Sequence, residues 1–396
     1  MRRIFTSFLA LSITLGAWAV IEGDGYYRVR NYKTDRYVYV LDDKGEVNYQ
    51  ATTAELGALE LWKNYDRTIS DPSTIIYVKD TDGKKRTYDL QAQGTGVEAI
   101  INSPVTIYMN NRDKGFYSIY GSNGSVVRYI GDATQTTEER GYLTSIGNTD
   151  YHRWYFMPVS ATDDTNYFGF APEFQQGDDY YGSIFAAFPF SFQSEGMKAY
   201  YVSYVDKKVV NLMEVKGVVP ANTPVIIKCS SATADGNRFN LGGNGKAVTD
   251  NLLRGVYFCN SSLRHRNQTA NVPATMRVIG LMSDGNVGFV TSKDTYLPRN
   301  KAYIVVPEGT PAELPITYDY AGVSEVEADA AEGIHVAADG LTLRVESAEG
   351  AVEVSVYNVA GQLVATGVAD GSPVILPSAG MYIVRTSTGA VKISVR

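Results

Sequence analysis

The stretch Tyr26–Val40, YYRVRNYKTDRYVYV, decides how the first part of the chain is expected to fold. It reads as a strand, a polar turn and a second strand that carries tyrosines. Two later segments have the same order, IIYVKDTDGKKRTYDL from Ile75 and GFYSIYGSNGSVVRYI from Gly115. The sequence therefore predicts a β unit whose opening occurs three times.

Three closing segments accompany these openings. They are LELWKN from Leu59, VTIYMNN from Val105 and RWYFMPV from Arg153, and each places an aromatic residue in an apolar strand. The openings recur at steps of about 40–50 residues, which is room for four short strands and their turns. A three-fold β domain over residues 20–159 is the expected result.

These segments resemble the repeat of ricin-type β-trefoil domains over residues 24–159. In that family, repeats that bind sugar close with Gln-x-Trp, whereas the matching tripeptides here are Glu60-Leu61-Trp62 and His152-Arg153-Trp154. We therefore interpret the tryptophans as core residues. Trefoils also present loops that block proteases, so the resemblance implies either glycan binding or a role as a protein-interaction domain or inhibitor.

A sugar subsite in such a repeat needs an aromatic residue beside an acid. Tyr39 with Asp42, and Tyr129 with Asp132, supply that pairing and are the candidate ligand-binding residues. The alternative is that these tyrosines only fill half-buried positions in a sheet, as Tyr commonly does.

A second β-rich domain is expected over residues 160–321. The segment AYYVSYVDKKVVNLMEV predicts a hairpin about Asp206-Lys207-Lys208, and Pro220 and Pro224 around Asn222 predict a bend before another strand. This zone resembles a module of secreted Bacteroidetes proteins that has no assigned chemistry.

Residues 322–333 hold four acids, no base and no aromatic residue, which is typical of a solvated linker. From Ile334 to Arg396 seven short runs with alternating apolar residues predict a small β-sandwich. The runs VEVSVYNVAGQLV, GMYIVR and VKISVR resemble the C-terminal sorting domain of the type IX secretion system. The resemblance implies recognition by outer-membrane secretion machinery and places these residues in the family's motif positions: Tyr357, Gly361, Gly380, Tyr382, Val384, Arg385 and Lys392.

The first 19 residues predict a secretory signal peptide. Arg2 and Arg3 precede an apolar run, and Ala17-Trp18-Ala19 forms an A-x-A cleavage site. The apolar run is shorter than the roughly 20 residues that span a bilayer, and no later run is long enough, so no transmembrane segment is expected in the mature chain. The protein is expected to pass through the periplasm and to be secreted or held at the cell surface.

Two cysteines, Cys229 and Cys259, occupy strand-like segments of the second domain. In an exported protein they could form a disulfide or remain as two buried thiols, and the sequence leaves both alternatives open.

Composition narrows the function. A net charge of -7 without a basic cluster beyond Lys84-Lys85-Arg86 argues against a nucleic-acid partner. His152, His265 and His335 lie one per zone, and no metal, cofactor or nucleophile motif is found, so no cofactor, metal or catalytic residue is predicted. The sequence predicts an exported, all-β, non-catalytic protein that binds glycan or a host glycoprotein, with a protein-interaction or inhibitor role as the alternative.

Overall fold

The structure is a computed structural model, and it describes most of the chain between residues 21 and 395. The described ranges are 21, 23–40, 54–62, 68–84, 87–92, 95–96, 105–111, 115–123, 126–132, 140–144, 149–259, 267–318, 334–339, 341–347, 351–358, 362–387 and 390–395. The expected signal peptide, the expected acidic linker, and residues Asp42, Gly361 and His265 lie outside these ranges.

Strands dominate the described residues, so the all-β prediction is confirmed. Helical geometry is limited in them to short turns such as the 3-10 turn Pro72–Thr74, which Asp71 caps by accepting a hydrogen bond from the Ser73 N–H. Tyr, Val, Ile and Thr fill these strands because branched and aromatic side chains suit a pleated, half-buried surface.

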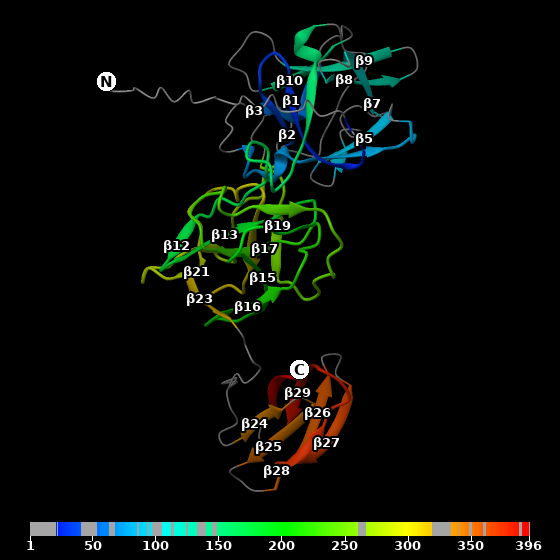
Figure 1. Cartoon of the computed structure of the whole chain (residues 1–396). Coiled ribbons are helices and arrows are strands. Elements are labelled where there is room, and N and C mark those ends of the chain that lie inside the picture. Colours follow the sequence, from blue (N-terminus) through cyan, green and yellow to red (C-terminus); the bar gives the residue numbers. More distant parts are fainter. Residues whose placement is uncertain are drawn as a thin grey trace, which may run out of the picture. The chain divides into compact units, whose positions relative to one another are not determined.

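The described residues of the first region form eleven strands (Figure 1). They are β1 (Gly25–Asn31), β2 (Tyr37–Val40), β3 (Ala54–Trp62), β4 (Ile76–Asp80), β5 (Thr87–Ala92), β6 (Thr95–Gly96), β7 (Val105–Asn111), β8 (Phe116–Asn123), β9 (Val126–Asp132), β10 (Arg140–Thr144) and β11 (Trp154–Pro158). The three predicted openings are the antiparallel pairs β1–β2, β4–β5 and β8–β9, and the three closings are β3, β7 and β11.

Backbone pairing closes this region into a ring. The pairings run β1–β4–β5–β7–β8–β11 and return to β1, and the β2–β3 and β9–β10 pairs join through β3 and β10. The three-fold symmetry is imperfect, because β7 and β11 both join this ring whereas the first closing strand, β3, pairs with β2 and β10 instead. Trp154 is fully buried and its indole N–H donates to the Ile130 carbonyl at 2.9 Å, as expected of a core residue.

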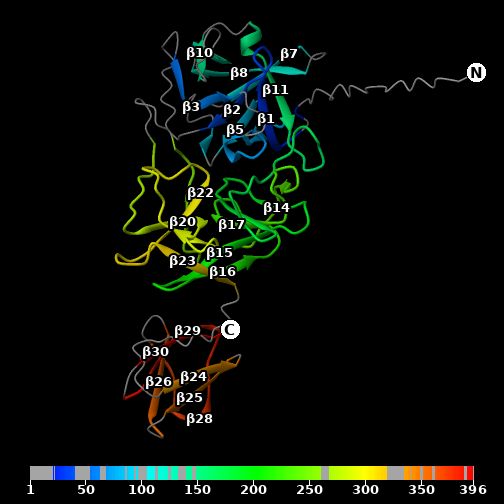
Figure 2. The same cartoon turned by 90° about the vertical axis from the view of Figure 1, so that its left-hand side faces the viewer.

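In the part of the second region that the structure describes, the strands form one ten-stranded sheet and one two-stranded sheet (Figure 2). Its strands are β12 (Phe174–Gln176), β13 (Asp179–Ile184), β14 (Phe190–Phe192), β15 (Lys198–Val205), β16 (Val210–Val215), β17 (Val225–Cys229), β18 (Phe239–Leu241), β19 (Leu253–Val256), β20 (Met276–Leu281), β21 (Val287–Val290), β22 (Lys301–Val305) and β23 (Glu313–Tyr318). The larger sheet has the order β12-β13-β17-β15-β16-β23-β21-β20-β22-β19, and β14 pairs with β18.

The local predictions for this region are confirmed. β15 and β16 form the expected hairpin, and the Asp206 carboxylate accepts the N–H groups of Lys208 and Val209 in its turn. Asn222 adopts a φ of 60° in the bend that precedes β17. Short polar side chains tolerate this left-handed conformation better than branched ones do.

The first two regions belong to one compact unit, Met1–Ile316. Arg28 of β1 is fully buried, and its guanidinium donates to the Asn166 side chain at 2.9 Å and to the carbonyls of Tyr167 and Thr68. The phenylalanine-rich core of the second region also includes Ile75 of the first region. Shared core and buried hydrogen bonds thus connect the two regions.

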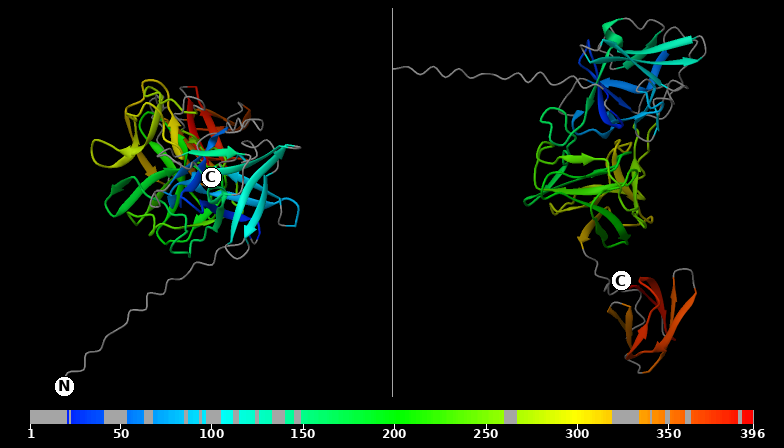
Figure 3. Two further views of the ribbon diagram at one scale, coloured as in Figure 1. Left: turned by 90° about the horizontal axis from the view of Figure 1, so that it is seen from above. Right: turned by 45° about the vertical axis from the view of Figure 1, so that its right-hand side comes forward.

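The second unit, Thr317–Arg396, contains all seven predicted runs as strands. They are β24 (Ile334–Asp339), β25 (Thr342–Ser347), β26 (Glu353–Asn358), β27 (Leu363–Val368), β28 (Asp370–Ile375), β29 (Gly380–Arg385) and β30 (Ala390–Val395). They form the sheets β24-β25-β28 and β27-β26-β29-β30, whose strands Figure 3 shows in orange to red. One core of alternating residues lies between them, including Leu343, Val356 and Val384.

Candidate functional site

The structure describes both members of one predicted sugar subsite, Tyr129 and Asp132, whereas Asp42 of the other lies outside the described residues. Asp132 is completely buried, and its carboxylate forms an ion pair with Arg36, whose Nε donates at 2.8 Å, and accepts from the Thr34 hydroxyl. Both oxygens of Asp132 are therefore bonded inside the domain rather than directed at solvent. The sequence could not indicate this, because Arg36 lies 96 positions away from Asp132.

The aromatic members of the subsites lie on two different strands. Tyr129 in β9 is half-buried, and its ring lies 5.1 Å from that of Tyr120 in the neighbouring β8. Tyr39 lies in β2 opposite Glu60 of β3. Of the predicted subsite residues, Tyr129 keeps a partly exposed ring, while Asp132 points into the domain.

The residues of the sorting-domain resemblance lie mostly on three adjacent strands. In the backbone register, Ile383 of β29 is paired with Tyr357 of β26 on one side and with Lys392 of β30 on the other. Tyr382 is buried and its hydroxyl donates to the Ser378 carbonyl at 2.7 Å, while Val384 is in the core. Gly380, at the start of β29, and Arg385, at its end, are exposed.

Both cysteines are free thiols and not a disulfide, but the alternative of two buried thiols holds only for Cys229. Cys229 is fully buried in β17, and burial raises the pKa of its thiol to about 11. Cys259 is partly exposed. Of the histidines, His152 is buried and His335 is exposed.

A cavity lies in the second region, where the sequence predicted no site. Its volume is about 600 Å³. Apolar side chains form its floor. They come from both ends of the ten-stranded sheet and, for Leu297, from the segment between β21 and β22: Phe174, Val256, Val278, Ile279, Val290, Leu297 and Ala302. Cavities of this size with an apolar lining and a few polar groups are typical of ligand-binding sites.

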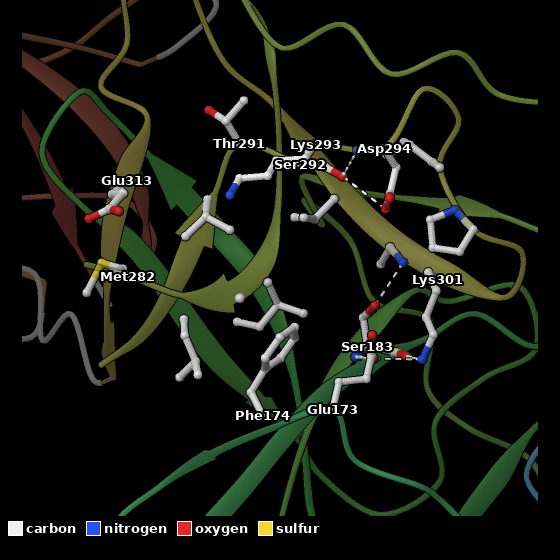
Figure 4. Close-up of a pocket in the computed structure, with 18 of the residues that line it drawn as sticks. Glu173, Phe174, Ser183, Met282, Thr291, Ser292, Lys293, Asp294, Lys301 and Glu313 are labelled. Atoms are coloured by element: carbon white, nitrogen blue, oxygen red, sulfur yellow. Dashed lines mark hydrogen bonds and ion pairs between the residues drawn. The ribbon is translucent and has the colours of Figure 1, made fainter. Parts of the chain in front are cut away.

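Polar groups lie around the mouth of this cavity (Figure 4). At one end the Lys301 ammonium donates to the Glu173 carboxylate at 2.6 Å, and at the other end Glu313 lies beside Met282. Glu313 accepts the Ser283 N–H at 3.0 Å and its hydroxyl at 2.8 Å. Figure 4 shows the exposed Lys293 side chain extending over the cavity between these ends.

The cavity forms where the curled sheet meets itself. Strands β12 and β13, at one end of the sheet order, lie close to β20–β22 near the other end, and the Phe185 N–H after β13 donates to the Asn300 carbonyl before β22 at 2.9 Å. The Ser183 hydroxyl accepts the Ala302 N–H at 3.1 Å, and the Gln176 side chain accepts the Val287 N–H at 2.8 Å. We call this junction, held by Gln176, Ser183 and the Glu173–Lys301 ion pair, the seam.

Two glycines shape the strands beside the seam. Gly280 of β20 and Gly288 of β21 are register partners, and a Cβ on Gly280 would lie 2.5 Å from the Val290 side chain. Glycine inside a strand often marks a place where another backbone or a ligand approaches closely. The turn Ser283–Asn286 lies between Gly280 and Gly288 in the sequence. This pair of glycines within strands is the sequence feature that could have indicated the site.

The arrangement is suited to binding by burial and charge. Burying an apolar group of a ligand in the cavity is favourable by roughly 25 cal/mol per Å² of buried surface. The charges at the mouth favour ligands that carry complementary charges beside that group. Among the described residues, no group of three or more His, Cys, Asp and Glu side chains is placed to hold a metal ion. No helix in the described ranges is long and apolar enough to cross a membrane.

Comparisons with known proteins give little further information. No protein-family model matches the sequence, and no curated protein matches it. A solved structure described as "Structure and mode of action of a mosquitocidal holotoxin" is similar to 94% of this chain at 12% identity and a TM-score of 0.25. This chain covers 44% of that one.

Proposed function

We propose that this protein is an exported, non-catalytic binding protein that captures partner proteins through the cavity at the seam. The observation that carries the proposal is the apolar floor beneath a charged mouth. A glycan presents hydroxyl groups that need polar partners throughout a site, whereas a protein segment offers apolar side chains for the floor and charges for the mouth. The cavity therefore favours the protein-interaction alternative over sugar binding.

Export belongs to the same proposal and is supported by sequence features alone. The signal-peptide pattern in residues 1–19 and the sorting-domain resemblance of residues 334–396 support passage through the periplasm and recognition by outer-membrane machinery. Binding would then occur outside the cell or at its surface.

Blocking the cavity tests the proposed binding. Ala312 is exposed and lines the cavity, so Ala312→Trp places a large ring at the mouth without disturbing the core. A random-peptide phage library selected on the full chain should enrich peptides that bind the wild type at least tenfold better than Ala312→Trp, about 1.4 kcal/mol. Ala274→Trp, also exposed but outside the cavity lining, is the matched control and should bind like the wild type. Equal binding by all three proteins would remove the cavity from consideration.

A second candidate function, glycan binding by the first region, is favoured by the Tyr120 and Tyr129 rings. These two partly exposed rings lie on neighbouring strands and offer apolar faces to a sugar. A glycan array probed with the wild type and Tyr129→Ala tests this candidate. Loss of a specific signal in the variant supports it, and a blank array for the wild type rejects it.

A further inference from the structure

The sheet splits beside the cavity, between β20 and β22. These strands pair from Met276–Val305 to Val278–Tyr303, and there the ladder ends. The next residues on each side, Ile279–Leu281 and Lys301–Ala302, both line the cavity instead of pairing with each other. The Ala302 N–H donates to the Ser183 side chain, so this edge of the split is already occupied.

The opposite edge, on β20, is not occupied by a strand among the described residues. Ile279–Leu281 pair with β21 on one side only. Successive residues of an antiparallel strand direct their N–H and C=O groups to alternate sides. At least one residue of Ile279–Leu281 therefore presents its backbone polar groups toward the split.

Gly280 lies in the middle of this edge and is one of the residues that line the cavity. The Val290 side chain occupies the position that a Cβ on Gly280 would take, so the edge offers its backbone to another chain. An unpaired strand edge is a template for an added strand, and peptides bind such edges by main-chain hydrogen bonds while neighbouring pockets select their side chains.

The charges at the mouth define the side chains of the incoming segment. Glu173 is neutralised by Lys301 at one end of the mouth. Glu313 at the other end accepts hydrogen bonds from Ser283 and, among the described residues, forms no ion pair. A basic residue is the complement of a carboxylate in that position. Lys293 extends between the two ends and does not lie beside Glu313 (Figure 4).

We propose that the cavity takes an extended polypeptide segment as an added strand along Ile279–Leu281, with an aliphatic side chain on the apolar floor and a basic side chain at Glu313. The inference rests on the proposed function and specifies its partner. In this proposal β20 forms main-chain hydrogen bonds with the segment, and residues such as Val278 and Val290 bury its aliphatic side chain. Glu313 gives the preference for a basic side chain.

Backbone methylation tests the strand geometry. A synthetic peptide from the phage selection is N-methylated at one residue at a time, and its dissociation constant for the full chain is measured by calorimetry. Added-strand binding predicts losses of about five- to tenfold per blocked donor at alternate residues, with small effects at the residues between them, because alternate N–H groups face the protein. Losses without this alternation overturn the added strand.

The outcomes separate this inference from the proposed function. If no peptide distinguishes the wild type from Ala312→Trp, both proposals fail. If peptides depend on the cavity but show no alternation under N-methylation, the binding function stands and the added strand fails.

The basic residue has its own test. Glu313→Gln keeps an acceptor for Ser283 and removes the charge, and it should weaken peptides that carry Lys or Arg by about three- to tenfold. The same change should leave versions of those peptides with the basic residue replaced by Gln unaffected. Glu308→Gln, an exposed acid outside the cavity, is the control. An equal effect of Glu313→Gln on both peptide versions would overturn the assigned charge contact.

Discussion

The first and second regions of this chain both curl a sheet, and they close it in different ways. In the first region backbone pairing runs around the complete ring, including β1–β4 and β8–β11. In the second region the Phe185 N–H, just after β13, donates to the Asn300 carbonyl, just before β22, and further contacts across the junction are made by the side chains of Gln176 and Ser183 and by the Glu173–Lys301 ion pair. Continuous backbone pairing leaves the strands contiguous, whereas closure mainly by side chains leaves space for a cavity.

The two regions also use their charges differently. Asp132 in the first region is fully buried and bonded by Arg36 and Thr34, so its charge is part of the core. Glu313 and Lys293 in the second region lie at the mouth of a cavity. An acid close to a tyrosine in the sequence is therefore a weak indicator of a binding site. A carboxylate that has no ion-pair partner in the folded structure is a stronger one.

Removing Asp132 should have the largest effect on stability. The Asp132→Ala substitution takes the carboxylate away from the largely buried Arg36 guanidinium, whose side chain is 11% exposed. Breaking a buried ion pair by deleting one partner costs about 3–5 kcal/mol. Urea unfolding of the full chain, followed by tryptophan fluorescence, should show this loss.

The matched control is Asp294→Ala at the mouth of the cavity. Asp294 is exposed and accepts a hydrogen bond from the Ser292 hydroxyl at 3.2 Å. Its removal should change the free energy of unfolding by less than about 0.5 kcal/mol. If Asp132→Ala and Asp294→Ala lower the free energy of unfolding equally, the buried ion pair of Asp132 does not stabilise the fold more than the exposed Asp294 does.

Local sequence patterns predicted the strands well and the cavity poorly. The repeated openings, the Asp206 hairpin and the seven C-terminal strands are visible because alternation and turn residues act over a few positions. The cavity gathers residues from Glu173 to Glu313, and the partner of Asp132 is 96 positions away. Such contacts depend on how the strands associate, which no local pattern records.

The buried His152 should make the first region sensitive to mild acid, an effect of up to about 3 kcal/mol. Burial lowers the pKa of its imidazole from 6.5 to about 4. The folded state keeps the ring neutral while the unfolded chain takes up a proton below pH 6.5, so the free energy of unfolding falls as the pH drops from 6.5 to about 4.

Substitution of His152 isolates this contribution. The His152→Gln variant should lose less stability than the wild type over the same pH window, because its side chain does not titrate. Urea unfolding at several pH values between 6.5 and 4 measures the two slopes. Parallel slopes would mean that His152 titrates alike in the folded and unfolded states.

The smallest expected effect concerns the seam. Ser183→Ala removes the hydroxyl that accepts the Ala302 N–H, and an unsatisfied buried donor costs about 1–2 kcal/mol. Because β20 does not pair with β22 at Ala302, the loss should also speed amide hydrogen exchange at Ala302.

The control for the seam is Ser292→Ala, which removes a hydroxyl at the cavity mouth that caps no strand. It should change neither the free energy of unfolding nor the exchange of Ala302. In the first region the comparable junction is the backbone pair Trp154–Tyr117, which no side-chain truncation can delete. An unchanged exchange rate of the Ala302 amide in Ser183→Ala would mean that the Ser183 side chain does not stabilise the seam. The split between β20 and β22 would then be maintained by the strands themselves.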